Sequence, residues 1–212
     1  MAAKATTKSG KSKDPKAKGS GESGSFDLLI VGVGGQGTIL ASNIIGEACI
    51  LEGRNVRSAE THGMAQRGGS VETHIRIDGR YGPLVPTGGA DMIISFDLLE
   101  ALRYRHFLKK GGTIVSSGGI TVPISAFQNN LEIPSADWIQ EQMSDIRLIT
   151  VDAESLAKEA GSILSQNVVM LGAAAKLLPI KKDSLLKAVV ELVPKKTVEI
   201  NKKAFLLGYE SA

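Results

Sequence analysis

Apolar and polar residues follow one another along the chain in blocks whose period changes, and each block predicts an element. Residues 26–31 form a mainly apolar run, which is typical of a buried strand, and a glycine-rich turn follows them. From about Thr38 to Glu52 the apolar positions recur roughly every 3.6 residues. This period predicts a helix that packs on a sheet through Ile39, Ile44, Ile45, Ala48 and Leu51.

The next elements are shorter. A second strand is expected near 53–57. Strict alternation over 71–77 then predicts a strand with one buried face, which turns His74 outward. The turn signal Asp78-Gly79-Arg80 predicts a hairpin-like return over 81–85.

From residue 90 onward, predicted strands and helices alternate. Strands are expected at 90–96, 113–117 and 146–151. Helices are expected at 98–107, 137–142, 153–160, 167–178, 183–192 and 197–209. A strand–helix–strand succession places helices on the faces of a parallel sheet. The sequence therefore predicts an α/β fold with a doubly wound, mainly parallel, Rossmann-like sheet and C-terminal helices.

Polar residues at the helix boundaries refine this prediction. Asp97, Ser135 and Asp183 stand at positions where an N-cap is needed. Lys109–Gly112 brings two cations and then two glycines, which predicts the end of the helix that Asp97 begins. Trp138 is expected to pack within its short helix.

Charge separates the first residues from the rest. Residues 1–25 carry six lysines against Asp14 and Glu22, a net charge of +4, while the whole chain carries +3, so residues 26–212 carry −1. We therefore expect a disordered basic arm over 1–25 and one domain over 26–212 that lacks the basic footprint of nucleic-acid binding. No apolar run reaches the ~18 residues of a membrane span and no secretory signal is evident, which predicts a cytoplasmic protein.

Cysteine and histidine content restricts the metal chemistry. Cys49 is the only cysteine among the 212 residues, whereas an iron–sulfur cluster needs about four thiolates. It falls on the apolar face of the first predicted helix, where a small buried hydrophobe is expected. The three histidines are scattered, so we expect no metal site on this chain.

The glycine-rich turn is the first candidate binding feature. Gly32-x-Gly34-x-x-Gly37, between a strand and a helix, fits the context of a dinucleotide fingerprint, and Glu60 is a candidate for the acidic residue that contacts ribose. The same turn also occurs where a helix and a strand simply pack closely. The candidate binding residues in the turn are Gly32, Gly34, Gly35, Gln36 and Gly37.

The polar stretch 60–71 is the second candidate. Arg67 places a guanidinium beside the exposed amides of Gly68 and Gly69, which suits a carboxylate or a phosphate. Gln66 adds an amide, and His62 is a candidate proton carrier, although a single histidine without an orienting acid is more often structural. His62 and Arg67 are therefore the catalytic candidates. His74 and His106 are expected to be structural.

Several separated motifs resemble one family. They are Gly32–Gly37, the run Glu60–Val71 containing His-Gly-Met-Ala-Gln-Arg-Gly-Gly, Pro83–Pro86, Ala90-Asp91, Asn167-x-x-x-Leu-Gly172 and Asn201–Gly208. In this order they resemble the gamma domain of the 2-oxoacid:ferredoxin oxidoreductases and, more narrowly, the small (beta) subunits of the indolepyruvate:ferredoxin oxidoreductases. The resemblance spans about residues 26–209.

The resemblance implies a subunit that is inactive alone. The complex would oxidatively decarboxylate arylpyruvates with coenzyme A as co-substrate, giving an aryl-acetyl-CoA, carbon dioxide and reduced ferredoxin. Thiamine diphosphate, Mg and 4Fe–4S clusters would lie on a large (alpha) subunit within a hetero-oligomer. The chain itself shows no thiamine diphosphate motif, Walker loop or nucleophile elbow, so no complete catalytic set is present.

Three alternatives stay open at this point. The chain is a free-standing Rossmann-type dinucleotide-binding oxidoreductase, a gamma subunit of a pyruvate-, ketoisovalerate- or oxoglutarate-type complex, or a purely structural interaction module.

Overall fold

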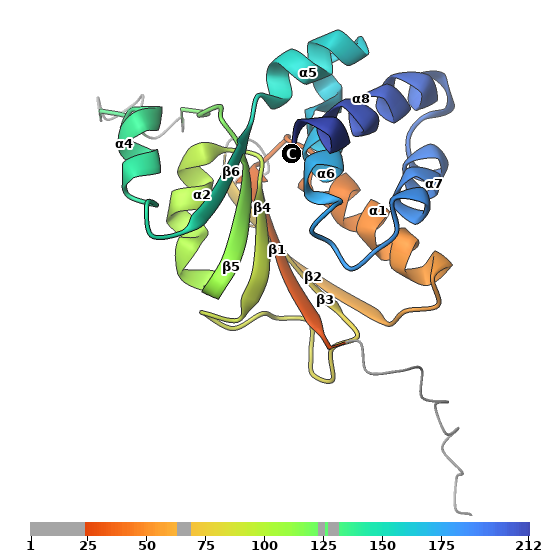
Figure 1. Ribbon diagram of the computed structural model, residues 1–212, viewed down its shortest axis with the longest axis horizontal. Coiled ribbons are helices and arrows are strands. Elements are labelled where there is room, and N and C mark those ends of the chain that lie inside the picture. The colour runs from red at the N-terminus through yellow and green to blue at the C-terminus, as the bar shows by residue number, and fades with distance from the viewer. Residues whose placement is uncertain (1–23, 63–68, 123–125, 127–131) are drawn as a thin grey trace, which may run out of the picture.

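The computed structural model describes residues 24–62, 69–122, 126 and 132–212, which form one sheet with helices on both of its faces (Figure 1). The strands are β1 (Phe26–Val33), β2 (Val56–His62), β3 (Ser70–Ile77), β4 (Ala90–Ser95), β5 (Leu108–Ser117) and β6 (Arg147–Val151). Their order across the sheet is β2-β3-β1-β4-β5-β6. Pairs β1–β4, β4–β5 and β5–β6 are parallel, whereas β3 runs antiparallel to both β1 and β2.

The helices divide between the two faces. They are α1 (Thr38–Leu51), α2 (Leu98–Tyr104), α4 (Ala136–Glu141), α5 (Ala153–Ala160), α6 (Gln166–Ala174), α7 (Lys182–Leu192) and α8 (Val198–Ser211), with short 3₁₀ turns at Arg105–Phe107, Ile163–Ser165 and Lys195–Thr197. One apolar core joins the sheet to α1 and α5–α8, and a second joins the opposite face to α2 and α4. The predicted doubly wound, mainly parallel α/β sheet with C-terminal helices is confirmed.

Strand β1 is covered on both faces of the sheet, which explains its apolar run Leu28–Val31. Leu28 and Ile30 belong to the core under α1, whereas Leu29 and Val31 belong to the core under α2, and all four are fully buried. A central strand covered on both faces needs apolar residues at every position, not at alternate ones.

The position of β3 departs from the predicted succession of parallel strands. The second strand starts at Val56, later than expected, and pairs with β3 as a hairpin, so β3 lies between β2 and β1. Asp78 closes the open end of this hairpin: its N–H donates to the Asn55 carbonyl (2.7 Å), and its carboxylate accepts from Asn55 N–H (3.0 Å) and from Arg54 Nε (2.9 Å). The predicted return over 81–85 is wrong, because this segment has no strand and Pro83 lacks an N–H to donate.

Residues Lys109–Gly112 do not end a helix as predicted. The α-helix ends at Tyr104, one 3₁₀ turn follows, and β5 already begins at Leu108. Pairing with β4 shifts register between Ala90 and Met92, and Gly111, at φ 80°, lies within the segment that absorbs the shift.

His74 is buried, not outward-facing as predicted. It is 3 % exposed, its Nδ1 accepts a hydrogen bond from Val85 N–H at 3.1 Å, and its ring stands edge-on to Phe107. The period of two was correct, but the segment after β3 covers the face that the pattern assigned to solvent. His106, by contrast, lies exposed within the 3₁₀ turn Arg105–Phe107.

Side chains at helix ends account for the remaining differences. Asp97 and Ser135 cap α2 and α4 as predicted. Asp183 does not cap α7 but lies in its first turn. In α1, the predicted burial of Ile44, Ile45 and Ala48 is confirmed. The prediction was wrong for Ile39 and Leu51 in the terminal turns of α1, which are 44 % and 47 % exposed, and for Trp138 in α4, which is 47 % exposed.

Helices α6 and α8 approach each other through two glycines. A Cβ on Gly172 would lie 2.1 Å from the carbonyl oxygen of Phe205, and a Cβ on Gly208 would lie 2.0 Å from the carbonyl oxygen of Val169. Backbone therefore contacts backbone, which only glycine permits at both positions. This helix pair, called the floor below, packs with α1, α5 and α7 on one face of the sheet.

Candidate functional site

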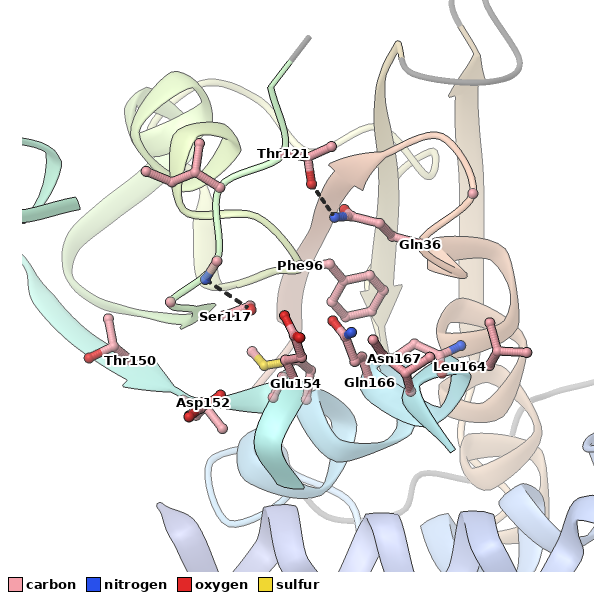
Figure 2. Close-up of a pocket in the computed structure, with 18 of the residues that line it drawn as sticks. Gln36, Phe96, Ser117, Thr121, Thr150, Asp152, Glu154, Leu164, Gln166 and Asn167 are labelled. Carbon is pink, nitrogen blue, oxygen red and sulfur yellow. Dashed lines mark hydrogen bonds between the residues drawn. The ribbon is translucent and has the colours of Figure 1, made fainter. Parts of the chain in front are cut away.

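A cleft of about 820 Å³ opens at the carboxyl ends of the parallel strands, where open α/β sheets usually bind ligands. Its walls come from the turn after β1, the loop after β5, the β6–α5 junction and the start of α6 (Figure 2). The residues that line it include Gly35, Gln36, Phe96, Ser117–Thr121, Gln140, Thr150–Glu154, Ile163, Leu164, Gln166, Asn167 and Met170.

Three amides of the glycine turn after β1 are already hydrogen-bonded to other groups of the protein. Val33 N–H donates to Gln36 Oε1 (2.7 Å), Gln36 N–H donates to the Val33 carbonyl (3.1 Å), and Gly34 N–H donates to the Gly69 carbonyl (2.8 Å). These three N–H groups are therefore not free for a phosphate, as they are in a phosphate-binding loop. Gly35, at φ 104° with open space beside it, faces the cleft.

Two of the other glycines make room for side chains. A Cβ on Gly32 would lie 2.7 Å from Gln36 Oε1, so its absence lets the Gln36 side chain fold back over the turn. Gly37, at φ 85°, would bring a Cβ to 2.3 Å from Asn167 Nδ2, the group that donates to the Gly37 carbonyl at 3.4 Å. The spacing of the glycines thus reflects contacts with Gln36 and Asn167.

The loop after β5 forms the opposite wall. Asp97, which is 1 % exposed, accepts from the amides of Leu99 and Glu100 at the start of α2 and also from the Thr121 amide. Leu98 N–H donates to the Gly119 carbonyl at 2.9 Å. The loop is thereby fixed to α2, and its Thr121 hydroxyl accepts a hydrogen bond from Gln36 Nε2 at 3.1 Å (Figure 2).

The charges of the cleft are negative. Asp152 and Glu154 lie where β6 passes into α5, and the part of the lining that the structure describes contains no Lys, Arg or His. The Ser155 hydroxyl and amide hydrogen-bond to Asp152 and hold the pKa of its carboxyl below the usual range, so it is ionised at neutral pH. An anionic ligand group is therefore disfavoured on the β6 side of the cleft.

A buried polar cluster lies behind the glycine turn. Ser70 Oγ donates to Glu100 Oε2 and lies 3.0 Å from Tyr104 Oη. Glu100 is 2 % exposed, and burial raises the pKa of its carboxyl, as it raises the pKa of the Tyr104 hydroxyl. The cluster anchors Ser70, and through it the Gly69 carbonyl on which Gly34 depends.

Comparison with known proteins decides the identity. Residues 27–211 match the family described as pyruvate ferredoxin/flavodoxin oxidoreductase. The chain belongs to this family. Four archaeal relatives named indolepyruvate oxidoreductase subunit IorB are 37–40 % identical to it; the one from Archaeoglobus fulgidus is 40 % identical over 88 % of this chain and 95 % of its own length.

More distant relatives have the same extent. The 2-oxoglutarate synthase subunit KorC of Methanocaldococcus jannaschii is 28 % identical over 88 % of this chain and 93 % of its own. The crystal structure of a keto/oxoacid ferredoxin oxidoreductase gamma subunit from Geobacter sulfurreducens superposes with a TM-score of 0.66 at 27 % identity, covering 88 % of this chain and 98 % of that chain. Each of these relatives is named as a subunit, and this chain matches nearly the whole length of each relative.

Within this family fold, the predicted binding residues divide into two groups. Gly35 and Gln36 line the cleft, Gly32, Gly34 and Gly37 shape the turn behind them, and the Gly69 carbonyl closes that turn. His62 ends β2, but its side chain, Gln66, Arg67 and Gly68 lie outside the described residues.

Glu60 is not placed like the ribose-binding acid of a dinucleotide site. It lies on β2, and β3 separates β2 from β1. Because neighbouring strands are about 4.8 Å apart, the strand that carries Glu60 is roughly 10 Å from β1. The dinucleotide fingerprint requires that strand beside β1.

Sequence reasoning missed the second wall of the cleft. The segment after residue 117 was predicted only as irregular, yet Ser117–Thr121 and Gln166-Asn167 supply much of the lining. The pair Gly118-Gly119 directly after a predicted strand was the available signal, since it repeats the strand-to-glycine pattern of Gly32–Gly37.

The described residues do not offer a set of ligands for an iron–sulfur cluster. They contain no group of three or more His, Cys, Asp or Glu side chains that could hold a metal ion. Cys49 is fully buried in α1, and burial raises the pKa of its thiol to about 12, far from the thiolate that a cluster ligand requires. In the same described part, no helix is long and apolar enough to cross a membrane.

Proposed function

We propose that this chain is the non-autonomous small subunit of an indolepyruvate-type oxidoreductase. The observation that carries the proposal is the 37–40 % identity to subunits of that name over nearly their whole length, against 28 % for the oxoglutarate-type subunit. The complex would convert an arylpyruvate, coenzyme A and oxidised ferredoxin into aryl-acetyl-CoA, carbon dioxide and reduced ferredoxin, the two electrons from decarboxylation passing to ferredoxin.

The reactive groups of this reaction belong on a large (alpha) partner subunit. Thiamine diphosphate with Mg would supply the carbanion chemistry there, and 4Fe–4S clusters would carry the electrons. The single buried thiol of this chain supports that division. The small chain would contribute the cleft at the carboxyl end of its sheet.

The cleft would receive part of coenzyme A at the junction with the large subunit. Its neutral amides from Gln140 and Gln166 suit hydrogen bonds to an uncharged polar segment, whereas Gln36 and Asn167 bond to the protein itself. Since Asp152 and Glu154 repel anions on the β6 side, the phosphates would lie toward the start of α1. Arg67, on the loop that follows β2 in the sequence, is the candidate cation for them.

Reconstitution tests the proposal. The chain co-purified with its large subunit is expected to reduce ferredoxin with indolepyruvate and coenzyme A, and the isolated chain to show neither activity nor a redox cofactor. An isolated chain that oxidises a 2-oxoacid would overturn the proposal.

Arg67 offers a sharper test of the cleft's role. Arg67→Ala is expected to lower turnover of the complex about tenfold, by loss of a charge-assisted contact, without changing the melting temperature. Arg80→Ala, at an exposed position elsewhere, is the matched control and should leave turnover unchanged. Normal ferredoxin reduction by the Arg67 variant would mean that these loops only shape the subunit interface.

The free-standing dinucleotide enzyme is the competing function. The separation of β2 from β1 argues against it. Titration of the isolated chain with NAD(H) or FAD distinguishes the two, because tight stoichiometric binding is expected only for the competing function.

A further inference from the structure

One side chain connects the two walls of the cleft. Gln36 lies in the turn after β1 and Thr121 in the loop after β5, and the hydrogen bond from Gln36 Nε2 to Thr121 Oγ1 at 3.1 Å spans the space between them (Figure 2). The two residues are 85 positions apart in the chain and both line the cleft. The distance between these two walls sets the width of the cleft that a ligand would enter.

The Gln36 end of this connection is fixed in place. Its Oε1 accepts from Val33 N–H at 2.7 Å, so the amide group has a single orientation and must present Nε2 to Thr121. Gly32 leaves the space in which the side chain folds back, since a Cβ there would come within 2.7 Å of Oε1.

The Thr121 end is fixed from the other direction. The Thr121 amide donates to the buried Asp97 carboxylate, which at the same time caps α2. Gly118 N–H donates to the Val151 carbonyl at 3.0 Å, which attaches the same loop to β6. Both ends of the connection are thus held, while the hydrogen bond itself is exposed to solvent.

We propose that Gln36 is a positioning residue that sets the width of the cleft by holding Thr121, and so the loop after β5, against the glycine turn. The function of the turn would then depend on its glutamine as much as on its glycines, because Gly32 leaves room for the Gln36 side chain and Val33 N–H orients its amide. The inference rests on the proposed function in assigning coenzyme A to the cleft.

Hydrogen exchange and steady-state kinetics on the complete complex test this. Thr121→Val keeps the size of the side chain and removes the acceptor, so Gln36 is released and exchange of the Val33 amide, far away in sequence, should quicken. The KM for coenzyme A should rise about fivefold, the value of one neutral hydrogen bond, with kcat and the KM for indolepyruvate unchanged. Gln36→Ala should quicken exchange over 118–121 and raise the same KM.

Controls and the double variant keep the outcomes separate. Thr121→Ser retains the hydroxyl and should restore the exchange and KM of the parent chain. Thr197→Val removes a hydroxyl that donates to the Pro194 carbonyl near α8 and should leave both readouts unchanged. The variant with both changes should be no worse than either alone, because one bond is lost in each case. The inference is overturned if Thr121→Val leaves exchange of the Val33 amide unchanged, or if exchange changes while the KM for coenzyme A does not. A parent complex that is inactive on arylpyruvates would instead refute the proposed function.

Discussion

The α6–α8 floor and the cleft above it are held together by opposite means. In the floor, Gly172 and Gly208 let two helix backbones meet in a buried contact. In the cleft, the loops are joined by polar bonds such as that between Gln36 and Thr121, which water can reach. Tight apolar packing resists local opening, whereas exposed polar bonds yield at small cost. Global stability is therefore expected to depend on the floor more than on the loops of the cleft.

The largest expected effect is at the helix contact. Gly172→Ala forces a methyl group to 2.1 Å from the Phe205 carbonyl oxygen, so the helices must separate. We expect a loss of about 3 kcal/mol in the free energy of unfolding, or about 6–12 °C in melting temperature for a chain of this size. Thermal unfolding followed by circular dichroism measures it.

Gly46→Ala is the matched control. Gly46 lies inside α1 and nothing is within 4 Å of the Cβ that alanine would add. Helix propensity then favours alanine by about 0.5–1 kcal/mol. Gly46→Ala should therefore leave the melting temperature unchanged or raise it slightly. Similar destabilisation by both substitutions would show that the α6–α8 contact is not special.

An intermediate effect is expected at Glu100, behind the glycine turn. Burial raises the pKa of this carboxyl in the folded chain, so the folded state holds the proton more tightly than the unfolded state. Its contribution to stability is complete below the ordinary pKa of a glutamate and is lost as pH rises through the raised value. Glu100→Gln, which still accepts from Ser70, should therefore gain stability relative to the parent chain as pH increases.

Urea unfolding of both chains between about pH 4 and pH 7.5 checks this. The difference between them isolates Glu100 from the other titrating groups. Parallel curves over the whole range would show that burial does not shift this group.

The smallest effect is expected from the basic arm. Deleting residues 1–23, which precede the described part of the chain, should change the free energy of unfolding by less than about 0.5 kcal/mol and leave assembly with the proposed large subunit intact. Analytical gel filtration with the partner measures assembly. A sharp fall in partner affinity would instead assign the arm a binding role.

The sequence pattern was sufficient wherever local and global preferences agree. The buried run of β1, the Asp97 and Ser135 caps and the buried face of α1 at Ile44 and Ile45 follow directly from period and composition. The doubly wound sheet follows from the same signals, because strand–helix alternation has few solutions.

Long-range contacts were beyond the pattern. Nothing local indicates that β3 inserts antiparallel beside β1, because the residues that pair, such as Phe26 with Ile77, are far apart in the sequence. Similarly, His74 alternates correctly, but a later segment covers it. In the site, the sequence pattern identified the glycines but not the contacts that require them. Those contacts are the Gln36 side chain folded over Gly32 and the Asn167 side chain against Gly37.

The solitary buried thiol of α1 has a practical consequence. Since Cys49 is the one cysteine of the chain and its pKa is raised to about 12, it does not react with alkylating probes while the core is closed. A cysteine introduced on either wall of the cleft can therefore carry a fluorophore or spin label without first removing the native one. Cys49 itself then serves as a built-in reporter, becoming modifiable only when the helix leaves the sheet.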